Sequence, residues 1–146
     1  MSDPHDLQRF RAAQDPIFAA VTAELGAGDK RSHWMWFVFP QIAGLGFSAT
    51  SRRYALRSLA EARAYLADPV LGARLRDCTA LVLGAKDRSA QQIFGSPDDA
   101  KFRSSMTLFA EAAPGEPLFA EALRRHFDGA PDRATLEQLA SQDRTA

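Results

Sequence analysis

The sequence has only one cysteine, Cys78, among its 146 residues, so no disulfide can form within the chain. Leu71, Leu75 and Val82 share helical spacing with Cys78, which predicts that the thiol is buried among apolar side chains. The alternative is a reactive thiol, which would need an accessible and electropositive setting.

The sequence also lacks an excess of charge of either sign and any long apolar run. Eighteen basic residues balance eighteen acidic ones, so no bulk attraction to nucleic acid or to an anionic membrane is expected. No apolar stretch approaches the ~20 residues of a membrane span, and no secretory leader opens the chain. These absences predict a cytoplasmic protein that binds neither nucleic acid nor a membrane.

Several signatures of chemistry are missing as well. The histidines, His5, His33 and His126, are scattered and have no metal-ligand spacing with Cys78. The sequence contains no nucleophile elbow and no phosphate loop of the Walker type. Lys101 and Ser104 stand in the reverse order of the usual Ser-x-x-Lys pair. We therefore expect no metal and no cofactor.

What the sequence does contain is helical periodicity. Apolar residues recur at three- and four-residue spacing, and strand-like alternation is scarce. The length fits one domain over residues 1–146, with an ordered core of about 6–140 and frayed ends. We predict an all-α fold, a compact array of about six to eight helices. The expected helices cover residues 6–14, 16–27, 58–66, 69–84, 89–94, 96–113, 117–127 and 133–140.

Capping signals support several of these helix starts. Ser58 and Glu61 have the spacing of a capping box, and Asp68 before a proline is typical of an N-cap. Ser96 with Pro97 in the first turn is the strongest predicted start in the chain.

Residues 32–40 are dense in aromatic side chains. We favour a short helix stopped by Pro40, and a buried strand is the alternative. Phe37 to Phe39 are expected in the core, whereas the polar His33 and Gln41 bracket the run. The indoles of Trp34 and Trp36 could offer flat faces for stacking a base or another ring.

The next segment, Gly44 to Ala49, formally fits a dinucleotide fingerprint. That fingerprint needs a preceding strand and a βαβ unit, which Pro40 and the helical pattern disfavour. The alternatives are a loop whose backbone amides face a ligand, or a plain connection. This loop, from Gln41 to Thr50, is expected to lead into a helix that contains Tyr54, and Ser48 and Ser51 lie in the same stretch.

The helix after Pro97 has a third candidate cluster. Asp98, Lys101 and Ser105 fall within about 60° of one another on a helical wheel, at the margin of the apolar stripe. They form either the polar wall of a pocket or a solvated surface with one Asp98–Lys101 ion pair. Ser104 and Ser105 in mid-helix favour a site, because serine is a mediocre helix former.

These segments resemble the family catalogued as domain of unknown function 1810. The resemblance rests on Lys30 to Gln41, Gly44-Leu45-Gly46, Asp68 to Gly72, Ile93-Phe94-Gly95, and Pro97 to Phe109. It covers about residues 6–140 and implies an all-helical fold, but little chemistry. Asp68 departs from the histidine often found before the proline. Some members bear the label calpastatin, which we do not carry over, since calpastatin is disordered and this composition is that of a folded domain.

A second likeness is to the helical NADAR domains, which are linked to ADP-ribose and related N-glycosidic chemistry. The matching pieces are Trp36 to Gln41, Ala100-Lys101, and Met106 with Phe109. This likeness implies a ligand related to a nucleotide or to ADP-ribose.

Two function classes follow. The first is an enzyme or binder of a nucleotide-like or sugar-phosphate-like small molecule, held in a polar and aromatic cleft. The second is a non-catalytic protein-interaction module, in which the same aromatics are core. The sequence leaves open the reaction, the substrate and the oligomeric state. Candidate catalytic residues are His33, Asp98 and Lys101, and candidate ligand-binding residues are Trp34, Trp36, Gln41, Ser48, Ser51, Tyr54, Lys101, Ser104 and Ser105.

Overall fold

The computed structural model describes residues 3–145, and within them the fold is all-α, as predicted. The described chain contains ten helices and one isolated parallel β-bridge, between Ile42 and Leu56. The helices are α1 (Gln8–Gln14), α2 (Phe18–Gly26), α3 (Met35–Val38), α4 (Ala49–Tyr54), α5 (Leu59–Ala67), α6 (Leu71–Gly84), α7 (Ala90–Phe94), α8 (Asp98–Ala112), α9 (Pro117–Phe127) and α10 (Arg133–Thr145).

The predicted count of six to eight helices is therefore wrong for the described residues. Three of the ten helices, α3, α4 and α7, have only four, six and five residues. Helices were expected at these three places, over residues 89–94, within residues 32–40 and around Tyr54, so the error lies in the stated count and not in the segments.

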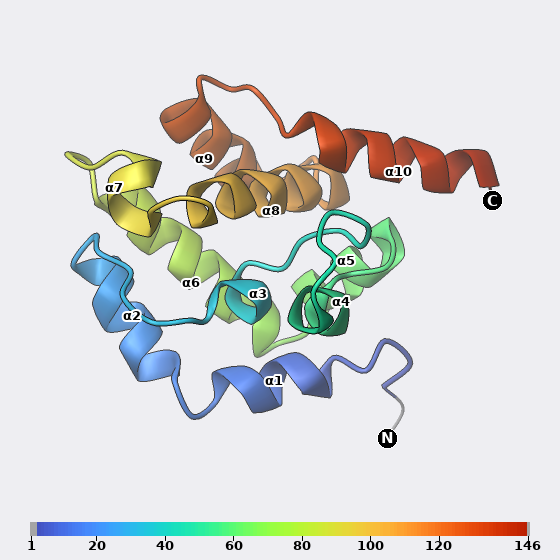
Figure 1. Cartoon of the computed structure of the whole chain (residues 1–146), viewed down its shortest axis with the longest axis horizontal. Helices are drawn as coiled ribbons and strands as arrows, with labels where there is room; N and C mark the ends of the chain where they lie inside the picture. Colours follow the sequence, from blue (N-terminus) through green and yellow to red (C-terminus); the bar gives the residue numbers. More distant parts are fainter. Residues whose placement is uncertain (1–2, 146) are drawn as a thin grey trace.

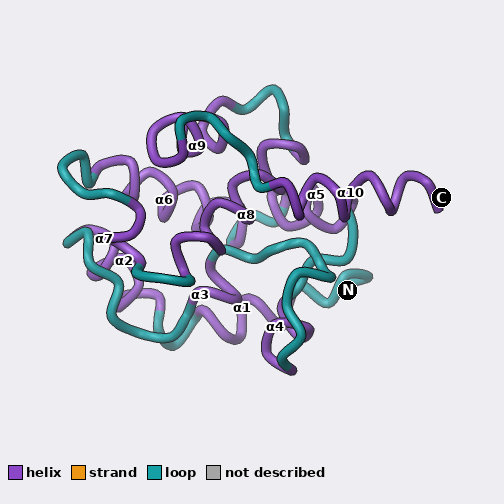
Figure 2. Tube along the Cα trace, turned by 45° about the horizontal axis from the view of Figure 1, so that its top comes forward, coloured by secondary structure: helices purple, strands orange, loops and turns teal. Residues whose placement is uncertain are grey.

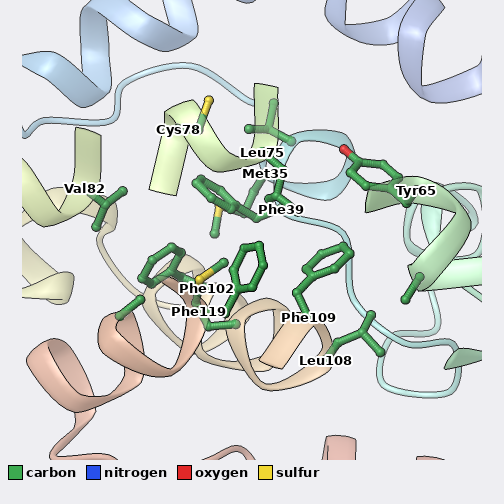
Figure 3. Close-up of a cluster of buried hydrophobic side chains, with 14 of the residues drawn as sticks. Met35, Phe39, Tyr65, Leu75, Cys78, Val82, Phe102, Leu108, Phe109 and Phe119 are labelled. Carbon is green, nitrogen blue, oxygen red and sulfur yellow. The ribbon is translucent and has the colours of Figure 1, made fainter. Parts of the chain in front are cut away.

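Helix α8 lies at the centre of the molecule (Figure 1) and packs against α5, α7, α9 and α10, while α6 packs against α2, α5 and α9. Its apolar stripe is buried as predicted: Phe102, Met106 and Phe109 have no exposed surface. Figure 3 shows Phe102 and Phe109 in one cluster with Phe119 of α9 and Leu75 of α6. This cluster joins the two longest central helices into one core.

Cys78 of α6 belongs to the same buried cluster (Figure 3), so the prediction of a buried thiol is confirmed. Burial disfavours the charged thiolate and raises the pKa of Cys78 to about 12.

A serine hydroxyl caps the start of each of three helices, α4, α5 and α7. The Ser58 hydroxyl accepts from the Glu61 backbone N–H at 3.1 Å, but the Glu61 carboxylate accepts from the Arg57 N–H instead of completing the box. Asp68 is not the N-cap of α6, which begins at Leu71 after Val70, but its Oδ2 accepts from the Leu71 N–H at 2.9 Å and so bonds the first turn of that helix. Ser96 does not cap α8, because α8 begins after Pro97 and the Asp99 N–H donates to the Gly95 carbonyl at 2.8 Å.

The aromatic segment forms the short helix α3, which ends before Pro40, and the alternative of a buried strand is wrong. The last helix, α10, runs to Thr145, beyond the predicted end at residue 140. Its C-terminal end projects past the helices on which it packs (Figure 2). In the part of the chain that the structure describes, no helix has the length and apolar character needed to cross a membrane.

Candidate functional site

The polar residues predicted to form a site lie around the loop of residues 41–57, which closes on itself. The Ala43 N–H donates to the Leu56 carbonyl at 2.8 Å, and the Leu56 N–H donates to the Gln41 carbonyl at 2.9 Å. Tyr54, at the end of α4, packs its ring 5.3 Å from that of Phe37. The two ends of the loop are thus tied together, and α4 lies between them.

A pocket of about 130 Å³ lies inside this loop, and we call it the loop pocket. Four of its lining residues were predicted as ligand-binding residues: Trp36, Gln41, Ser51 and Tyr54. The remaining lining residues are Ile42, Ala43, Gly44, Leu45, Gly46, Arg52, Ala55 and Arg57. The pocket therefore combines aromatic walls with amide, hydroxyl and guanidinium groups.

A second pocket, of about 260 Å³, adjoins it along α8, and we call it the α8 pocket. The two pockets share Gln41, Leu45, Gly46 and Ser51. The α8 pocket adds Pro97, Ala100, Lys101, Ser104, Asp132 and Ala134. The loop of residues 41–57 and the first half of α8 thus bound two adjacent pockets, which we call the cleft and which bring together residues about 50 positions apart in the sequence.

Lys101 is held where the two pockets meet. Its Nζ lies 4.6 Å from the centre of the Trp36 ring and 3.5 Å from Asp98 Oδ1. Asp98 Oδ2 lies 2.8 Å from the Nζ of Lys30, and that ammonium lies 4.9 Å from the Trp34 ring centre. One carboxylate therefore bridges two ammonium groups, each placed over an indole.

Lys30 is a residue that sequence reasoning missed. Its side chain is only 6% exposed, and its ammonium also donates to the Ser32 carbonyl at 2.6 Å. A buried ammonium needs such partners, because an unpaired buried charge is costly. Lys30 and Asp98 lie on two segments far apart in the sequence, so no local sequence pattern could predict their ion pair.

Glu24 of α2 was also missed. Its carboxylate accepts hydrogen bonds from the backbone N–H groups of Arg31 and Ser32 at 2.7 and 2.9 Å. It also accepts from the Ser32 hydroxyl at 2.7 Å and from Trp34 Nε1 at 3.1 Å. Partial burial tends to raise the pKa of Glu24, but these hydrogen bonds outweigh it and lower the pKa to about 2. Glu24 thereby fixes the segment that leads into α3 and Trp36.

Five predicted site residues do not line the cleft: Asp98, whose carboxylate is engaged with the two lysines, and four others. His33 is exposed and lines none of the described pockets, since the turn before α3 directs it outward. Trp34 is buried with its indole N–H on Glu24, so its ring is core rather than a stacking surface. Ser48 accepts from the Ser51 N–H at 3.0 Å and serves as the N-cap of α4. Ser105 is fully buried, and its hydroxyl has no partner among the described residues.

Ser104, in contrast, lines the α8 pocket. Its hydroxyl donates to the Ala100 carbonyl at 3.1 Å, one turn earlier in the helix. This local bond accounts for a serine in mid-helix and leaves its oxygen lone pairs as acceptors at the pocket wall.

The glycines of the loop serve close packing. Gly44 has φ +100°, and a Cβ there would lie 2.6 Å from Gln138 Oε1 of α10. A Cβ on Gly46 would lie 2.7 Å from the Ser51 side chain. No strand precedes these glycines in the described chain, so the dinucleotide-fingerprint interpretation is wrong.

Helix α10 closes the far side of the cleft. Gln142 Nε2 donates to the Arg57 carbonyl at 2.8 Å, and the Asp132 N–H donates to the Thr107 hydroxyl at 2.8 Å. Asp132 and Ala134 also line the α8 pocket. Among the residues that the structure describes, no three His, Cys, Asp or Glu side chains gather to hold a metal ion.

Fold and cleft together define a small all-helical domain with a polar and aromatic pocket. Residues 4–139 match the family described as Protein of unknown function (DUF1810), so the chain belongs to that family. The chain is also similar to the conserved hypothetical protein Rv1873 from Mycobacterium tuberculosis, known from a crystal structure. The two share 51% sequence identity over 94% of this chain and 99% of the other, with a TM-score of 0.93. A search of curated proteins finds no match.

Proposed function

We propose that this protein binds a small molecule with a flat ring and an anionic group, nucleotide-like or sugar-phosphate-like, in the cleft between the 41–57 loop and α8. The observation that carries the proposal is the position of Lys101, whose ammonium lies over the Trp36 ring at the junction of the two pockets. An aromatic surface and a fixed cation at one junction suit a ligand that has both a ring and a negative charge.

The local charge favours an anion. Lys30 and Lys101 share the carboxylate of Asp98, so these three side chains have one net positive charge, while the Asp132 carboxylate of the α8 pocket accepts from the N–H and hydroxyl of Thr135. The side chain of Lys101 is 24% exposed, which leaves room for a ligand to reach its ammonium. An anion that meets Lys101 forms a charge-assisted hydrogen bond in a site that is partly shielded from water.

The size of the cleft is compatible with such a ligand. The loop pocket and the α8 pocket are each smaller than the ~300 Å³ of typical small-molecule sites. Because they share four residues, one ligand that spans both has a space at the lower end of that range. A nucleoside or a phosphosugar fits this scale better than a large cofactor does.

The cleft supports binding better than it supports acid–base chemistry. Among the three catalytic candidates, Lys101 alone lines the cleft. Asp98 is engaged with two lysines, and His33 lies elsewhere on the surface.

The alternative of a protein-interaction module has less support. Among the described residues, the exposed large hydrophobic side chains are Phe47, at 79%, and Val70, at 39%. They stand on separate segments, and isolated exposed apolar residues are ordinary on protein surfaces. A concave polar cleft favours a small ligand.

A thermal-shift screen tests the proposal. Nucleosides, nucleotides, ADP-ribose and phosphosugars are added singly to the purified protein. A ligand at 100 times its Kd stabilises the folded state by about 2.7 kcal/mol, which shifts the Tm by several degrees. The thermal shift that a compound causes should be lost in Trp36→Leu if the compound binds in the cleft. Absence of any shift across these compounds at millimolar concentration would contradict the proposal.

A further inference from the structure

Beside the loop pocket lies a third cavity, of about 280 Å³, which we call the arginine pocket. It is lined by Pro4, His5, Asp6, Arg9, Arg52, Arg53, Arg57, Ser58 and Glu61. We infer that the arginine pocket is a second anion subsite, which takes a phosphate or diphosphate group of the ligand. This inference rests on the proposed function, and it narrows the ligand to one with two separated anionic groups.

The arginine pocket adjoins the cleft. Arg52 and Arg57 line both the loop pocket and the arginine pocket. Lys101 lines the α8 pocket, which adjoins the loop pocket through four other shared residues. The loop pocket therefore has a cationic neighbour in each of the two pockets that adjoin it.

The charge of the arginine pocket favours an anion more strongly than that of the α8 pocket. Four arginines face two carboxylates, those of Asp6 and Glu61. Glu61 is 3% exposed and already engaged, with its carboxylate 3.5 Å from the Arg9 guanidinium and accepting from the Arg57 N–H. Once Arg9 is paired with Glu61, the other positive charges of the pocket belong to the exposed side chains of Arg52, Arg53 and Arg57.

Arg9 builds the pocket rather than binding the ligand. Its guanidinium donates to the carbonyls of His5 at 2.6 Å, Asp6 at 2.7 Å, Arg53 at 2.7 Å and Ala55 at 3.1 Å. These bonds tie the start of α1 to the end of α4. Arg9 is therefore a positioning residue that holds the walls of the pocket in place.

Arg52 and Arg57 have the opposite character. Both are exposed, and neither guanidinium donates a hydrogen bond or forms an ion pair within the part of the chain that the structure describes. A guanidinium fork matches two oxygens of a phosphate, and two such forks at one rim can hold a dianion. The guanidinium groups of Arg52 and Arg57 lie beside the aromatic loop pocket, and this arrangement suits a ring-bearing ligand with a phosphate group.

Calorimetric titration with inorganic pyrophosphate, at low ionic strength, tests the subsite without a ring-bearing ligand. The variants are Arg52→Ala, Arg57→Ala, Lys101→Ala and, as a matched control, Arg125→Ala on the exposed face of α9. Loss of Arg52 or Arg57 should weaken pyrophosphate binding about tenfold, the effect of one lost charge-assisted contact. Arg125→Ala should bind pyrophosphate within about twofold of the parent, whereas Lys101→Ala reports whether pyrophosphate also occupies the α8 pocket.

The same titration separates the two proposals. If pyrophosphate fails to bind the parent protein, or binds Arg52→Ala and Arg57→Ala as tightly as the parent, the inference is overturned. If pyrophosphate depends on Lys101 and not on the arginines, the α8 pocket is the anion site, which also overturns the inference while the proposed function stands. If Arg52→Ala or Arg57→Ala weakens pyrophosphate binding, but no ring-bearing compound needs Trp36 for its thermal shift, the anion subsite stands and the proposed function fails.

Discussion

Asp98 bridges Lys30 and Lys101: its two carboxylate oxygens lie 2.8 Å from one ammonium and 3.5 Å from the other. The first ammonium is buried and anchors the segment before α3 to the start of α8. The second stands over Trp36 at the cleft. One carboxylate thus couples the stability of the fold to the placement of the proposed ligand-binding lysine.

Replacement of Asp98 by asparagine should destabilise the protein by about 3 kcal/mol, because it leaves the buried Lys30 ammonium without a counter-charge. Asp99→Asn is the matched control, since Asp99 lies in the same first turn of α8 and loses the same helix-dipole interaction. Urea denaturation measures both variants. Equal losses in the two variants would mean that the ion pair contributes nothing beyond the dipole.

Glu24 should make stability depend on pH in the acid range. Its pKa is about 2 when folded and 4.5 ordinarily, so folding favours the carboxylate form. The stabilisation is fully present above pH 4.5 and is lost as the pH falls toward 2. Unfolding free energies measured between pH 6 and pH 2 should fall more steeply for the parent than for Glu24→Gln. Glu111→Gln, at an exposed position of α8, should follow the parent curve.

Phe109→Ala should destabilise the protein by about 3–5 kcal/mol through the cavity it leaves. The Phe109 ring is fully buried, with its centre 5.5 Å from that of Tyr65 and 5.7 Å from that of Phe119. Phe47→Ala, at a side chain that is 79% exposed, should cost less than about 0.5 kcal/mol. Denaturant midpoints compare the two, and a loss below about 1 kcal/mol for Phe109→Ala would show that this ring is not a core anchor.

Cys78 should not react with a thiol reagent while the protein is folded. Its sulfur is buried and its pKa is about 12, so the nucleophilic thiolate is scarce at neutral pH. Colour development with a disulfide reagent should begin only when denaturant unfolds the chain. Rapid labelling of the native protein at pH 7 would contradict this burial.

Much of the fold was predictable because its signals are local. The Ser58 hydroxyl caps α5, and the Asp68 carboxylate accepts from the first residue of α6, each through a backbone N–H three residues away. The spacing of Phe102, Met106 and Phe109 gave the buried face of α8 directly. The short helices α3, α4 and α7 lie where helices were expected, but the stated total of six to eight did not include all of them.

The site was predictable only in part. The pattern marked Trp36, Gln41, Ser51, Tyr54, Lys101 and Ser104, which the fold brings to the cleft. It misplaced Ser105, because a helical wheel gives the angle of a residue but not the width of the buried sector. Helix α8 packs against both α5 and α9, and this second neighbour turns the polar margin into core.

The residues that were missed depend on contacts across the chain. Lys30 pairs with Asp98, and the Gln142 amide reaches the Arg57 carbonyl from 85 residues away. Arg52 and Arg57 stand in an unremarkable polar stretch until the loop closes beside Arg9. Only the three-dimensional fold shows that these cations line one cavity.

Replacement of Lys101 separates its effect on ligand affinity from its effect on the stability of the free protein. Lys101→Ala should weaken any ligand found in the thermal-shift screen by about tenfold, because it removes a charge-assisted contact. The Tm of the free variant should stay within about 2 °C of the parent, since a partly exposed lysine contributes little to folding. Lys86→Ala, at an exposed lysine distant from the cleft in sequence, is the control and should bind as the parent does.

The most direct test of the proposed cleft is a tryptophan-fluorescence titration of the parent and Trp36→Leu with the strongest ligand from the screen. Trp34 is buried on Glu24, so a ligand in the cleft should change the emission of Trp36 and leave that of Trp34 nearly constant. We predict a saturable change in the parent, with the same Kd as the thermal shift, and none in Trp36→Leu. A ligand that binds both proteins with equal affinity and with the same spectral change would place its site elsewhere and contradict the account.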